Sequence, residues 1–235
     1  MTWNSTYQTN KRVWGNKPSE LASFACDYLR EVRAQYDNIE ILDVGCGYGR
    51  DASYLAQSVN CNVLGIDNAN EAIEMARKGL VVELKSRVRF RCRNFKQVIG
   101  HKFEVVFVSN LYQLLDIEDR STFRDMIKRS LKRNGMFFLS TLSTSDPEHF
   151  GKGERIKNES NSFRDEKFLH FCTREEIEKD FSFLSIKKLN EHEYYESRSN
   201  GQTHHHISWM LLGVNQYHSN LPTASHCRIS QGAQK

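Results

Sequence analysis

The stretch from Ile41 to Ala56, ILDVGCGYGRDASYLA, constrains the fold of this chain more than any other. A short apolar run enters a loop that carries Gly45, Gly47 and Gly49, and apolar residues then recur at the spacing of one helix face. The order is therefore strand, tight glycine turn, helix. Glycine reaches positive φ without penalty and lets a ligand approach the backbone closely. The helix that follows presents free N–H groups at its N-terminus.

The glycine spacing separates two classes of cofactor. The dinucleotide fingerprint G-x-G-x-x-G needs its third glycine where Arg50 stands, which argues against a nicotinamide oxidoreductase. The third glycine comes one residue earlier, and the motif DVGCGYG resembles motif I of the class I S-adenosylmethionine-dependent methyltransferases. This resemblance implies that the three glycines let the backbone approach S-adenosyl-L-methionine, and that Asp43 supports the loop.

Size and composition predict a single soluble domain. The chain has 235 residues, of which 39% are hydrophobic and 26% charged. No apolar run approaches the ~20 residues of a membrane helix, and the N-terminal residues lack the apolar segment of a secretory signal. Six cysteines without a C-x-x-C pair indicate reduced thiols in the cytoplasm. The net charge of +4 does not by itself demand nucleic acid.

A carboxylate ends the second apolar stretch, Cys61 to Asp67. An acid at the tip of the second strand can accept both ribose hydroxyls of an adenosyl group. Asp67 is therefore the candidate ribose ligand, and Asn68 beside it a candidate for positioning the adenosine. The alternative is an ordinary acidic cap, because Asn70 to Leu84 has a helical pattern.

Residues 87–95, RVRFRCRNF, alternate strictly and predict a strand with four arginines on one face. A basic strip can bind RNA or an acidic partner. The alternative is an edge strand whose charges prevent aggregation, and the class I order puts the third strand at the edge. The family has an acid at the position of Asn94, which holds the adenine amino group. Asn94 can still accept from that group, and Phe95 is expected beside it.

The apolar run Phe103 to Val108 predicts a buried strand, and polar residues follow it. Ligands of open α/β sheets sit at the carboxyl ends of the strands. We therefore expect Asn110 and Tyr112 to flank the transferred methyl group. The Asn/Asp-Pro-Pro-aromatic loop of methyltransferases that act on base or glutamine amino groups is missing here, which argues against DNA or peptide-amide substrates. A helix at 119–133 and a strand at 135–142 complete this half.

The expected organisation is one domain with additions. Residues 1–35 form an N-terminal cap segment and helix, residues 36–216 the methyltransferase domain, and residues 217–235 a disordered tail without periodicity. Residues 143–172 form an inserted lid. The aromatic residues of the cap either pin it to the body or close over the cofactor, with Trp14 as the expected contact.

The second half is similar, more loosely, to small-molecule methyltransferases of the tellurite-resistance type. Residues 168–176 open a helix, with Thr173 and Glu176 as a capping box. Strands are expected at 183–195 and 204–214. The resemblance implies a Rossmann-like, doubly wound α/β sheet of seven strands, mostly parallel. Its seventh strand is antiparallel and lies between the fifth and sixth.

Histidines gather where this topology places the acceptor. An antiparallel seventh strand begins at the carboxyl edge, and alternation puts His204 and His206 on one face and His205 on the other. His149, His170 and His192 are expected to converge on the same edge. They can bind a divalent metal, bind or deprotonate the substrate, or form a solvated rim. The sequence leaves these three alternatives open.

The function expected from these features is transfer of a methyl group from S-adenosylmethionine to a small-molecule acceptor. His204, His206, His170 and Tyr112 are the candidate catalytic residues. Two alternatives remain: an RNA or protein methyltransferase that uses the basic strand, and a module that binds S-adenosylmethionine without catalysis. Strong salt dependence of RNA binding would favour the first.

Overall fold

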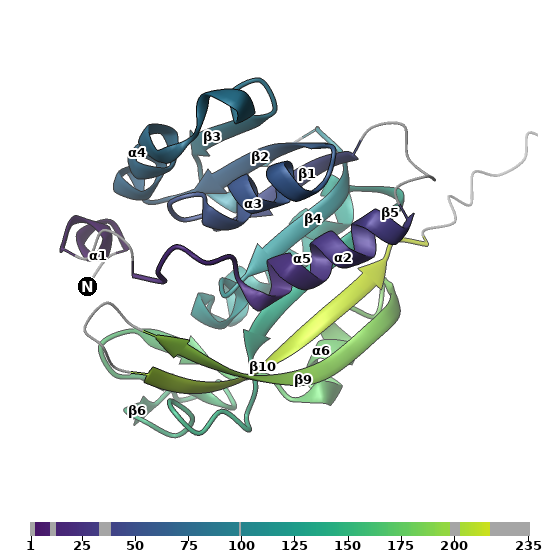
Figure 1. The fold of residues 1–235 in the computed structure, drawn as a ribbon. Helices are drawn as coiled ribbons and strands as arrows, with labels where there is room; N and C mark the ends of the chain where they lie inside the picture. The colour runs from purple at the N-terminus through teal and green to yellow at the C-terminus, as the bar shows by residue number, and fades with distance from the viewer. Residues whose placement is uncertain (1–2, 10–12, 33–38, 99, 198–202, 217–235) are drawn as a thin grey trace, which may run out of the picture.

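Seven strands form a single sheet in the order β3-β2-β1-β4-β5-β10-β9 (Figure 1). The computed structural model describes residues 3–9, 13–32, 39–98, 100–197 and 203–216. The strands are β1 (Ile39–Val44), β2 (Cys61–Asp67), β3 (Val88–Cys92), β4 (Phe103–Ser109), β5 (Leu131–Leu142), β9 (Ser185–Ser197) and β10 (Thr203–Val214). Only β10 runs against its neighbours β5 and β9. The predicted doubly wound sheet, with its seventh strand between the fifth and sixth, is confirmed.

Helices cover both faces of the sheet, as alternation along the strands requires. Helices α2 (Glu20–Val32), α3 (Arg50–Ser58) and α4 (Asn70–Gly79) pack on the face that receives Ile41. Helices α5 (Ile117–Ser130) and α6 (Arg174–Asp180) pack on the face that receives Leu42. Successive strand residues point to opposite sides, so the apolar strands fill two cores, one on each side of the sheet (Figure 1).

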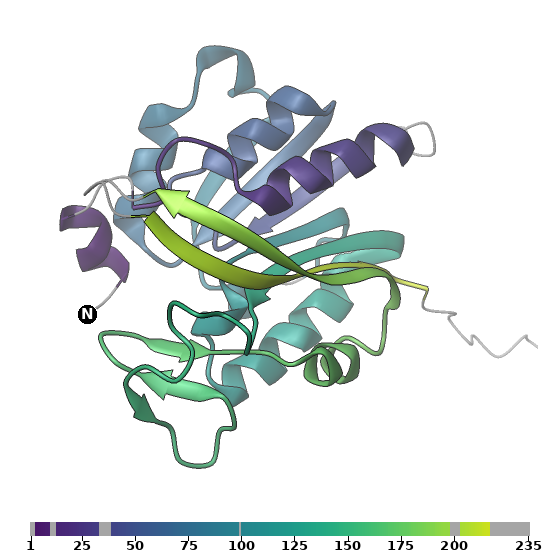
Figure 2. The same cartoon turned by 60° about the horizontal axis from the view of Figure 1, so that its bottom comes forward.

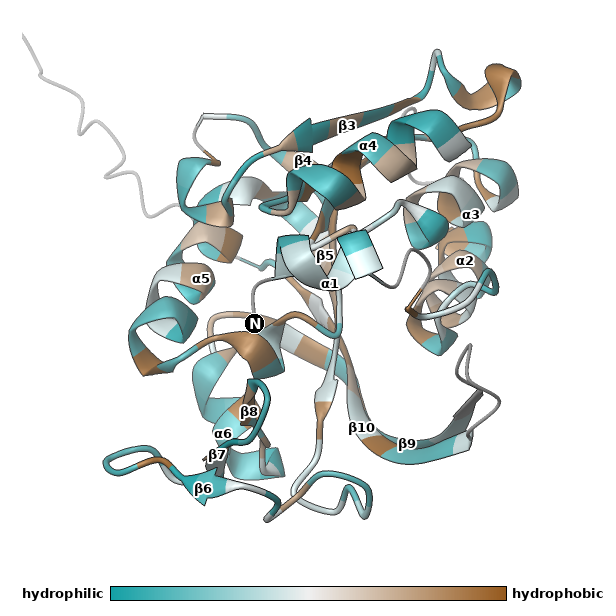
Figure 3. Ribbon diagram, turned by 90° about the vertical axis from the view of Figure 1, so that its left-hand side faces the viewer, coloured by the Kyte–Doolittle hydropathy of each residue, from teal (hydrophilic) through white to brown (hydrophobic). Residues whose placement is uncertain are grey.

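Two additions lie at the carboxyl edge of the parallel strands. Helix α1 (Trp3–Thr9) crosses this edge (Figure 3). The predicted lid, residues 143–172, contains a small antiparallel sheet of β6 (Glu154–Arg155), β7 (Ser162–Arg164) and β8 (Phe168–His170) (Figure 2). The rings of Phe150, Phe163 and Phe171 pack edge to face, with centroids 5.4–6.0 Å apart, which gives the lid a small apolar centre.

Several predicted boundaries were wrong in ways that hydrogen bonding explains. The helix expected to reach Leu84 ends at Gly79, because Leu80 adopts extended backbone; a 3₁₀ turn, η2, follows at Val82–Leu84. The strand expected to reach Phe95 ends at Cys92, and residues 95–97 form a second 3₁₀ turn, η3. Apolar periodicity continued through these ends, so it did not reveal them.

Two later boundaries also differ from the prediction. The helix expected at 119–133 spans Ile117–Ser130, and β5 begins at Leu131, which pairs with Phe103. Residues 168–170 belong to strand β8, and helix α6 begins only at Arg174. Thr173 caps this helix, because its hydroxyl accepts from the Glu176 N–H at 3.2 Å.

The arginine-rich strand β3 lies at the edge of the sheet, as predicted. Val88 and Phe90 are buried, whereas Arg89 and Arg91 are exposed. Within the described residues, no helix is both long and apolar enough to cross a bilayer. The tail at 217–235 and most of the predicted hairpin at 196–203 lie outside the described residues.

Replacing Gly49 by alanine should destabilise the fold. Gly49 has φ +77°, and an added Cβ would stand 2.5 Å from the Phe90 ring. The left-handed backbone costs roughly 1–2 kcal/mol and overpacking roughly 1–3 kcal/mol, so urea unfolding should show a loss of about 2–5 kcal/mol. Gly79→Ala is the control, because nothing lies within 4 Å of its added Cβ. Equal stability of the two variants would contradict this account.

Candidate functional site

The glycine loop between β1 and α3 has the backbone that its sequence predicts. Gly45, Gly47 and Gly49 have φ values of 77°, 52° and 77°, which only glycine adopts without strain. The N–H groups of Gly45 and Cys46 donate to the Ile66 carbonyl at 2.8 and 3.0 Å. The loop is therefore bonded to the end of the neighbouring strand, which fixes its shape.

Asp67, at the end of β2, extends this bonding to the next residues of the loop. One carboxylate oxygen accepts from the Gly47 N–H at 2.9 Å and the other from the Ala69 N–H at 2.8 Å. Burial raises the pKa of Asp67, and these backbone hydrogen bonds oppose that rise. A carboxylate offers about four acceptor positions, so Asp67 can still accept a hydrogen bond from a ligand hydroxyl group.

A cavity of about 230 Å³ lies beside the loop, at the carboxyl ends of β1, β2 and β4. Nine of the ten predicted cofactor residues line it: Trp14, Asp43, Gly45, Gly47, Asp67, Asn68, Asn94, Phe95 and Asn110. Gly49 does not line it, because its Cα packs against Phe90 and Ala76 on the far side of the loop. The structure thus brings residues from five separate segments to one cavity.

Asp43 has an unusual environment in the wall of this cavity. Its side chain is only 2% exposed, and one carboxylate oxygen has no hydrogen-bond partner within the described residues. Burial raises the pKa of Asp43 well above its ordinary value, and the negative charges of Asp51 and Asp67 add to the rise. A buried, unpaired carboxylate is costly, so this oxygen is suited to a cationic group of a ligand.

Asn94 and Phe95 lie at the opposite end of the cavity. The Asn94 side-chain oxygen accepts from the Lys96 N–H at 2.9 Å and caps the turn η3. Phe95 packs edge-on against Phe123, with ring centroids 5.4 Å apart. Their predicted contact with adenine stays a prediction, but Asn94 also has a structural role as a cap that the sequence analysis did not assign.

Residues 3–9 and 13–19, which we call the N-terminal arm, are bonded directly to the glycine loop. The Tyr48 hydroxyl donates to the Gly15 carbonyl at 2.7 Å and accepts from the Trp14 N–H at 3.2 Å. The Arg50 guanidinium donates to the carbonyls of Trp14 and Lys17. Trp3, Tyr7 and Trp14 line the cavity. The sequence did not predict these roles of Tyr48 and Arg50, although Arg50 stands where a dinucleotide fingerprint would have glycine.

A second cavity, of about 300 Å³, lies between the arm, the lid and the sheet edge. It shares Trp3, Trp14, Asn110 and Leu114 with the first cavity, so the two adjoin at Trp14 and Asn110. A third cavity, of about 450 Å³, is also lined by Trp14 and Asn110, and His192 and Tyr194 complete its wall. Asn110 marks the junction and has a left-handed backbone, with φ 56°.

Three histidines gather beside the second cavity. His204 and His206 lie on one face of β10, and His149 lies in the lid; a ligand nitrogen of each is within 4.8 Å of the others. The buried Asp146 carboxylate accepts from His206 Nδ1 at 3.1 Å. Burial raises the pKa of Asp146, but hydrogen bonds from His206 and the backbone bring it below its ordinary value. Burial, and then His206, lower the pKa of His149.

The other histidines expected at this edge lie elsewhere. His205 lies on the opposite face of β10, as alternation predicted, where it stacks on Tyr195 and contacts Glu193 at 2.7 Å. His192 stacks on Tyr194, and its Nε2 lies 3.6 Å from Glu20. His192 therefore borders the third cavity and is separate from the cluster of three.

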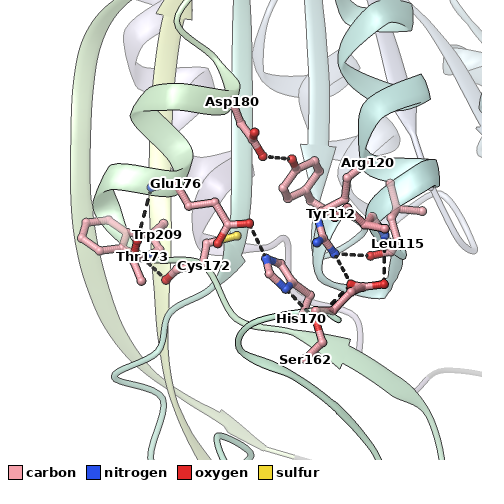
Figure 4. Close-up of polar contacts among 12 residues, drawn as sticks. Tyr112, Leu115, Arg120, Ser162, His170, Cys172, Thr173, Glu176, Asp180 and Trp209 are labelled. Carbon is pink, nitrogen blue, oxygen red and sulfur yellow. Dashed lines mark hydrogen bonds and ion pairs between the residues drawn. The ribbon is translucent and has the colours of Figure 1, made fainter. Parts of the chain in front are cut away.

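The predicted convergence of His170 and Tyr112 on the acceptor was wrong (Figure 4). His170 is 1% exposed and is held between Ser162 and Glu176, each at 2.8 Å. Tyr112 is fully buried, donates its hydroxyl to Asp180 at 2.5 Å, and has a pKa raised by burial. Neither residue lines any of the three cavities. They join the lid and η4 (Tyr112–Leu114) to α6, and Gln113 lines the second cavity instead.

Comparison with known proteins agrees with this geometry. Residues 41–135 match the family described as "Methyltransferase domain". The ubiquinone biosynthesis O-methyltransferase of Bartonella tribocorum is 26% identical over 113 residues, which are 46% of this chain and 43% of that protein. This chain thus matches less than half the length of that curated relative.

Two solved structures share the fold. The 1,6-didemethyltoxoflavin N1-methyltransferase of Burkholderia thailandensis, solved with its substrate and S-adenosylhomocysteine, aligns with a TM-score of 0.65 and 15% identity, covering 91% of this chain and 85% of that one. TehB of Haemophilus influenzae aligns with a TM-score of 0.58 and 14% identity, covering 80% and 61%. At these identities the likeness shows the fold alone.

Removing the Tyr48 hydroxyl should loosen the arm. Tyr48→Phe loses two hydrogen bonds to the arm, worth about 0.5–1.5 kcal/mol each. Acrylamide should then quench the fluorescence of the arm tryptophans more strongly than in the wild type. Tyr54→Phe on α3 is the control, because no hydrogen bond of its hydroxyl is found within the described residues. Equal quenching in both variants would show that Tyr48 does not hold the arm.

Proposed function

We propose that this chain, whose residues 41–135 match a methyltransferase domain, is a class I S-adenosylmethionine-dependent methyltransferase. It would transfer the sulfonium methyl group of S-adenosylmethionine to a small-molecule acceptor. The observation that carries the proposal is the cavity at the glycine loop, where Asp43 and Asp67 face a ligand from two strand ends. The matched domain covers this loop and both carboxylates.

The cofactor would lie along the first cavity with its charged groups at the two acids. Asp67 would accept hydrogen bonds from the ribose hydroxyls, since its carboxylate lines the cavity at the end of β2. The unpartnered oxygen of Asp43 would face the ammonium group of the methionine moiety. Asn68, Asn94 and Phe95 would surround the adenosine. The arm, with Trp14, would close over it as the proposed cap.

The transferred methyl group would lie at the junction of the cavities, beside Asn110 and Trp14. In the reaction, a lone pair of the acceptor atom attacks the methyl carbon, and the carbon–sulfur bond breaks. Its electron pair stays on sulfur, which gives S-adenosylhomocysteine. The protein has to align the two ligands and exclude water. A protic acceptor must also lose its proton, which is where the histidine cluster enters.

A small acceptor is favoured by the second cavity. Its volume of about 300 Å³ is at the lower end of the roughly 300–1,000 Å³ of small-molecule sites. The lid covers one side of it, and Lys152, Lys167 and Gln113 supply polar groups. The relatives with the same fold include proteins whose names state small-molecule acceptors. Residues 143–172 are thus proposed as the acceptor lid.

The alternatives use other parts of the molecule. An RNA or protein methyltransferase would use the exposed arginines of β3, at the sheet edge farthest from the second cavity. A module without catalysis would bind S-adenosylhomocysteine and methylate no acceptor. The five cysteines among the described residues are free, in keeping with the proposed cytoplasmic location.

Asp43→Asn tests the cofactor assignment. The amide removes a buried unpaired charge, so the ligand-free protein should melt at the same or a higher temperature. Binding of S-adenosylhomocysteine should weaken about 10- to 100-fold, since a hydrogen bond to a charged group contributes ~1.5–3 kcal/mol. Titration calorimetry measures this, with Asp27→Asn, an exposed residue of α2, as the control. Undiminished affinity, or no binding to the wild type, would refute the assignment.

His206→Ala tests the acceptor side. Methyl transfer to acceptors of the phenol, carboxylic acid and N-heterocycle classes should fall about 10²–10⁴-fold, the usual contribution of a positioned proton-transfer group. Binding of S-adenosylhomocysteine should be unchanged, because His206 does not line the first cavity. His205→Ala, on the opposite face of β10, should keep full activity. Loss of cofactor binding in His206→Ala would move His206 to a structural role.

A further inference from the structure

The three histidines described above form a compact group beside the second cavity. His149 comes from the lid, while His204 and His206 are two residues apart on β10 and face the same side. Their ring centroids are 5.3–6.1 Å apart. A proton acceptor needs only one of these rings, so the presence of three calls for another explanation.

Burial argues against a solvated rim. His206 is 4% exposed, and the side chain of His204 is 22% exposed. The Nδ1 atom of His204 is buried without a hydrogen-bond partner in the described residues; its nearest carboxylate oxygen, on Glu148, is 3.5 Å away. A buried polar atom without a partner costs free energy, so this imidazole is oriented for a ligand.

Asp146 supports the group in the way that carboxylates support metal-binding histidines. It accepts from His206 Nδ1, which fixes the tautomer, so Nε2 is the ring nitrogen that would bind a metal. The same carboxylate accepts from the backbone N–H groups of His149 and Ile207, at 2.8 and 3.1 Å. One buried side chain therefore sets both the lid turn that carries His149 and the strand that carries His206.

We infer that His149, His204 and His206 bind one divalent first-row transition metal cation, with Zn²⁺ as the first candidate. Three neutral imidazoles leave a fourth position open, as in catalytic zinc sites. His149 and His206 line the second cavity, so the open position is beside the proposed acceptor. Nitrogen ligands at ~2.0–2.1 Å from a tetrahedral zinc ion are about 3.3 Å from one another. The three imidazole nitrogens lie within 4.8 Å of one another, so metal binding would bring them closer together. Rotation of the imidazole side chains would supply this change, while Asp146 keeps the backbone of His149 in place.

A second group, His170, Cys172 and Glu176, also has metal-ligand spacing, but its contacts argue against a metal. Both ring nitrogens of His170 are already hydrogen-bonded, to Ser162 and Glu176. Burial raises the pKa of the Cys172 thiol, which opposes the thiolate form that metals bind.

The inferred cation deepens the proposed function by defining the class of acceptor, and this part rests on that function. An acceptor with a hydroxyl or thiol group would coordinate the open position. The cation would lower the pKa of that group and hold its oxygen or sulfur beside the methyl carbon. The acceptor would lose its proton to solvent or to a neighbouring base, and the cation would remain on the protein.

The test uses the full chain. A chelator first removes any bound metal, and the protein is then titrated with Co²⁺ in the absence of other metals and of substrate. Co²⁺ reports its coordination through visible absorption, which is independent of turnover. We expect one equivalent to bind with the absorption of a four- or five-coordinate nitrogen site, and Zn²⁺ to displace it. His149→Ala and His204→Ala should each weaken binding more than about 10-fold, because even a supporting partner of a ligand contributes 10–100-fold.

His205→Ala is the matched control, because it removes an imidazole from the same strand but from the opposite face. Binding that falls equally in His205→Ala, or six-coordinate absorption typical of loosely held Co²⁺, would overturn the inference. Calorimetry with S-adenosylhomocysteine on the same samples separates the two proposals. Cofactor binding without Co²⁺ binding refutes the metal site alone, whereas Co²⁺ binding without cofactor binding refutes the methyltransferase proposal alone.

Discussion

The left-handed turn after β1 is the constraint on which the rest of this structure depends. Side chains at Gly47 and Gly49 would collide with Tyr7 and Phe90, so the turn admits only glycine if the arm and β3 are to pack where they do. The same turn directs its N–H groups to Ile66 and Asp67 at the end of β2. The wall of the first cavity and the position of the arm both depend on this one local geometry.

Much of the fold was predictable because its signals are local. Apolar strands, the glycine spacing and the Thr173 cap each depend on residues within a few positions, and alternation on β10 separated His205 from His204 and His206. Helix and strand ends were less predictable, since backbone hydrogen bonds decide them and hydrophobicity does not. The small sheet in the lid carried no periodic signal, because its strands span two or three residues.

The residues of the candidate site could be predicted from the sequence less completely than the fold. The cofactor residues follow strand ends, which topology alone brings together. The burial of a side chain depends on tertiary packing, which the sequence does not give. Residues that are neighbours in the sequence can therefore differ in whether they reach a cavity. Tyr112 and Gln113 are adjacent, yet one is fixed in the core against Asp180 and the other lines a cavity. Asp146 had no signal at all, since its importance comes from contacts with His206 and Ile207, 60 residues or more away.

The bonds between the arm and the glycine loop have a thermodynamic consequence. Tyr48 and Arg50 belong to the loop but hold the arm, and the arm supplies three aromatic walls of the cavity. Any ligand that contacts the docked arm must stabilise docking by the same factor by which docking raises its affinity. Docking of the N-terminal arm and binding in the cavity are therefore coupled equilibria. A change in the docking of the arm can be measured as a change in ligand affinity, and ligand binding can be measured as a change in the docking of the arm.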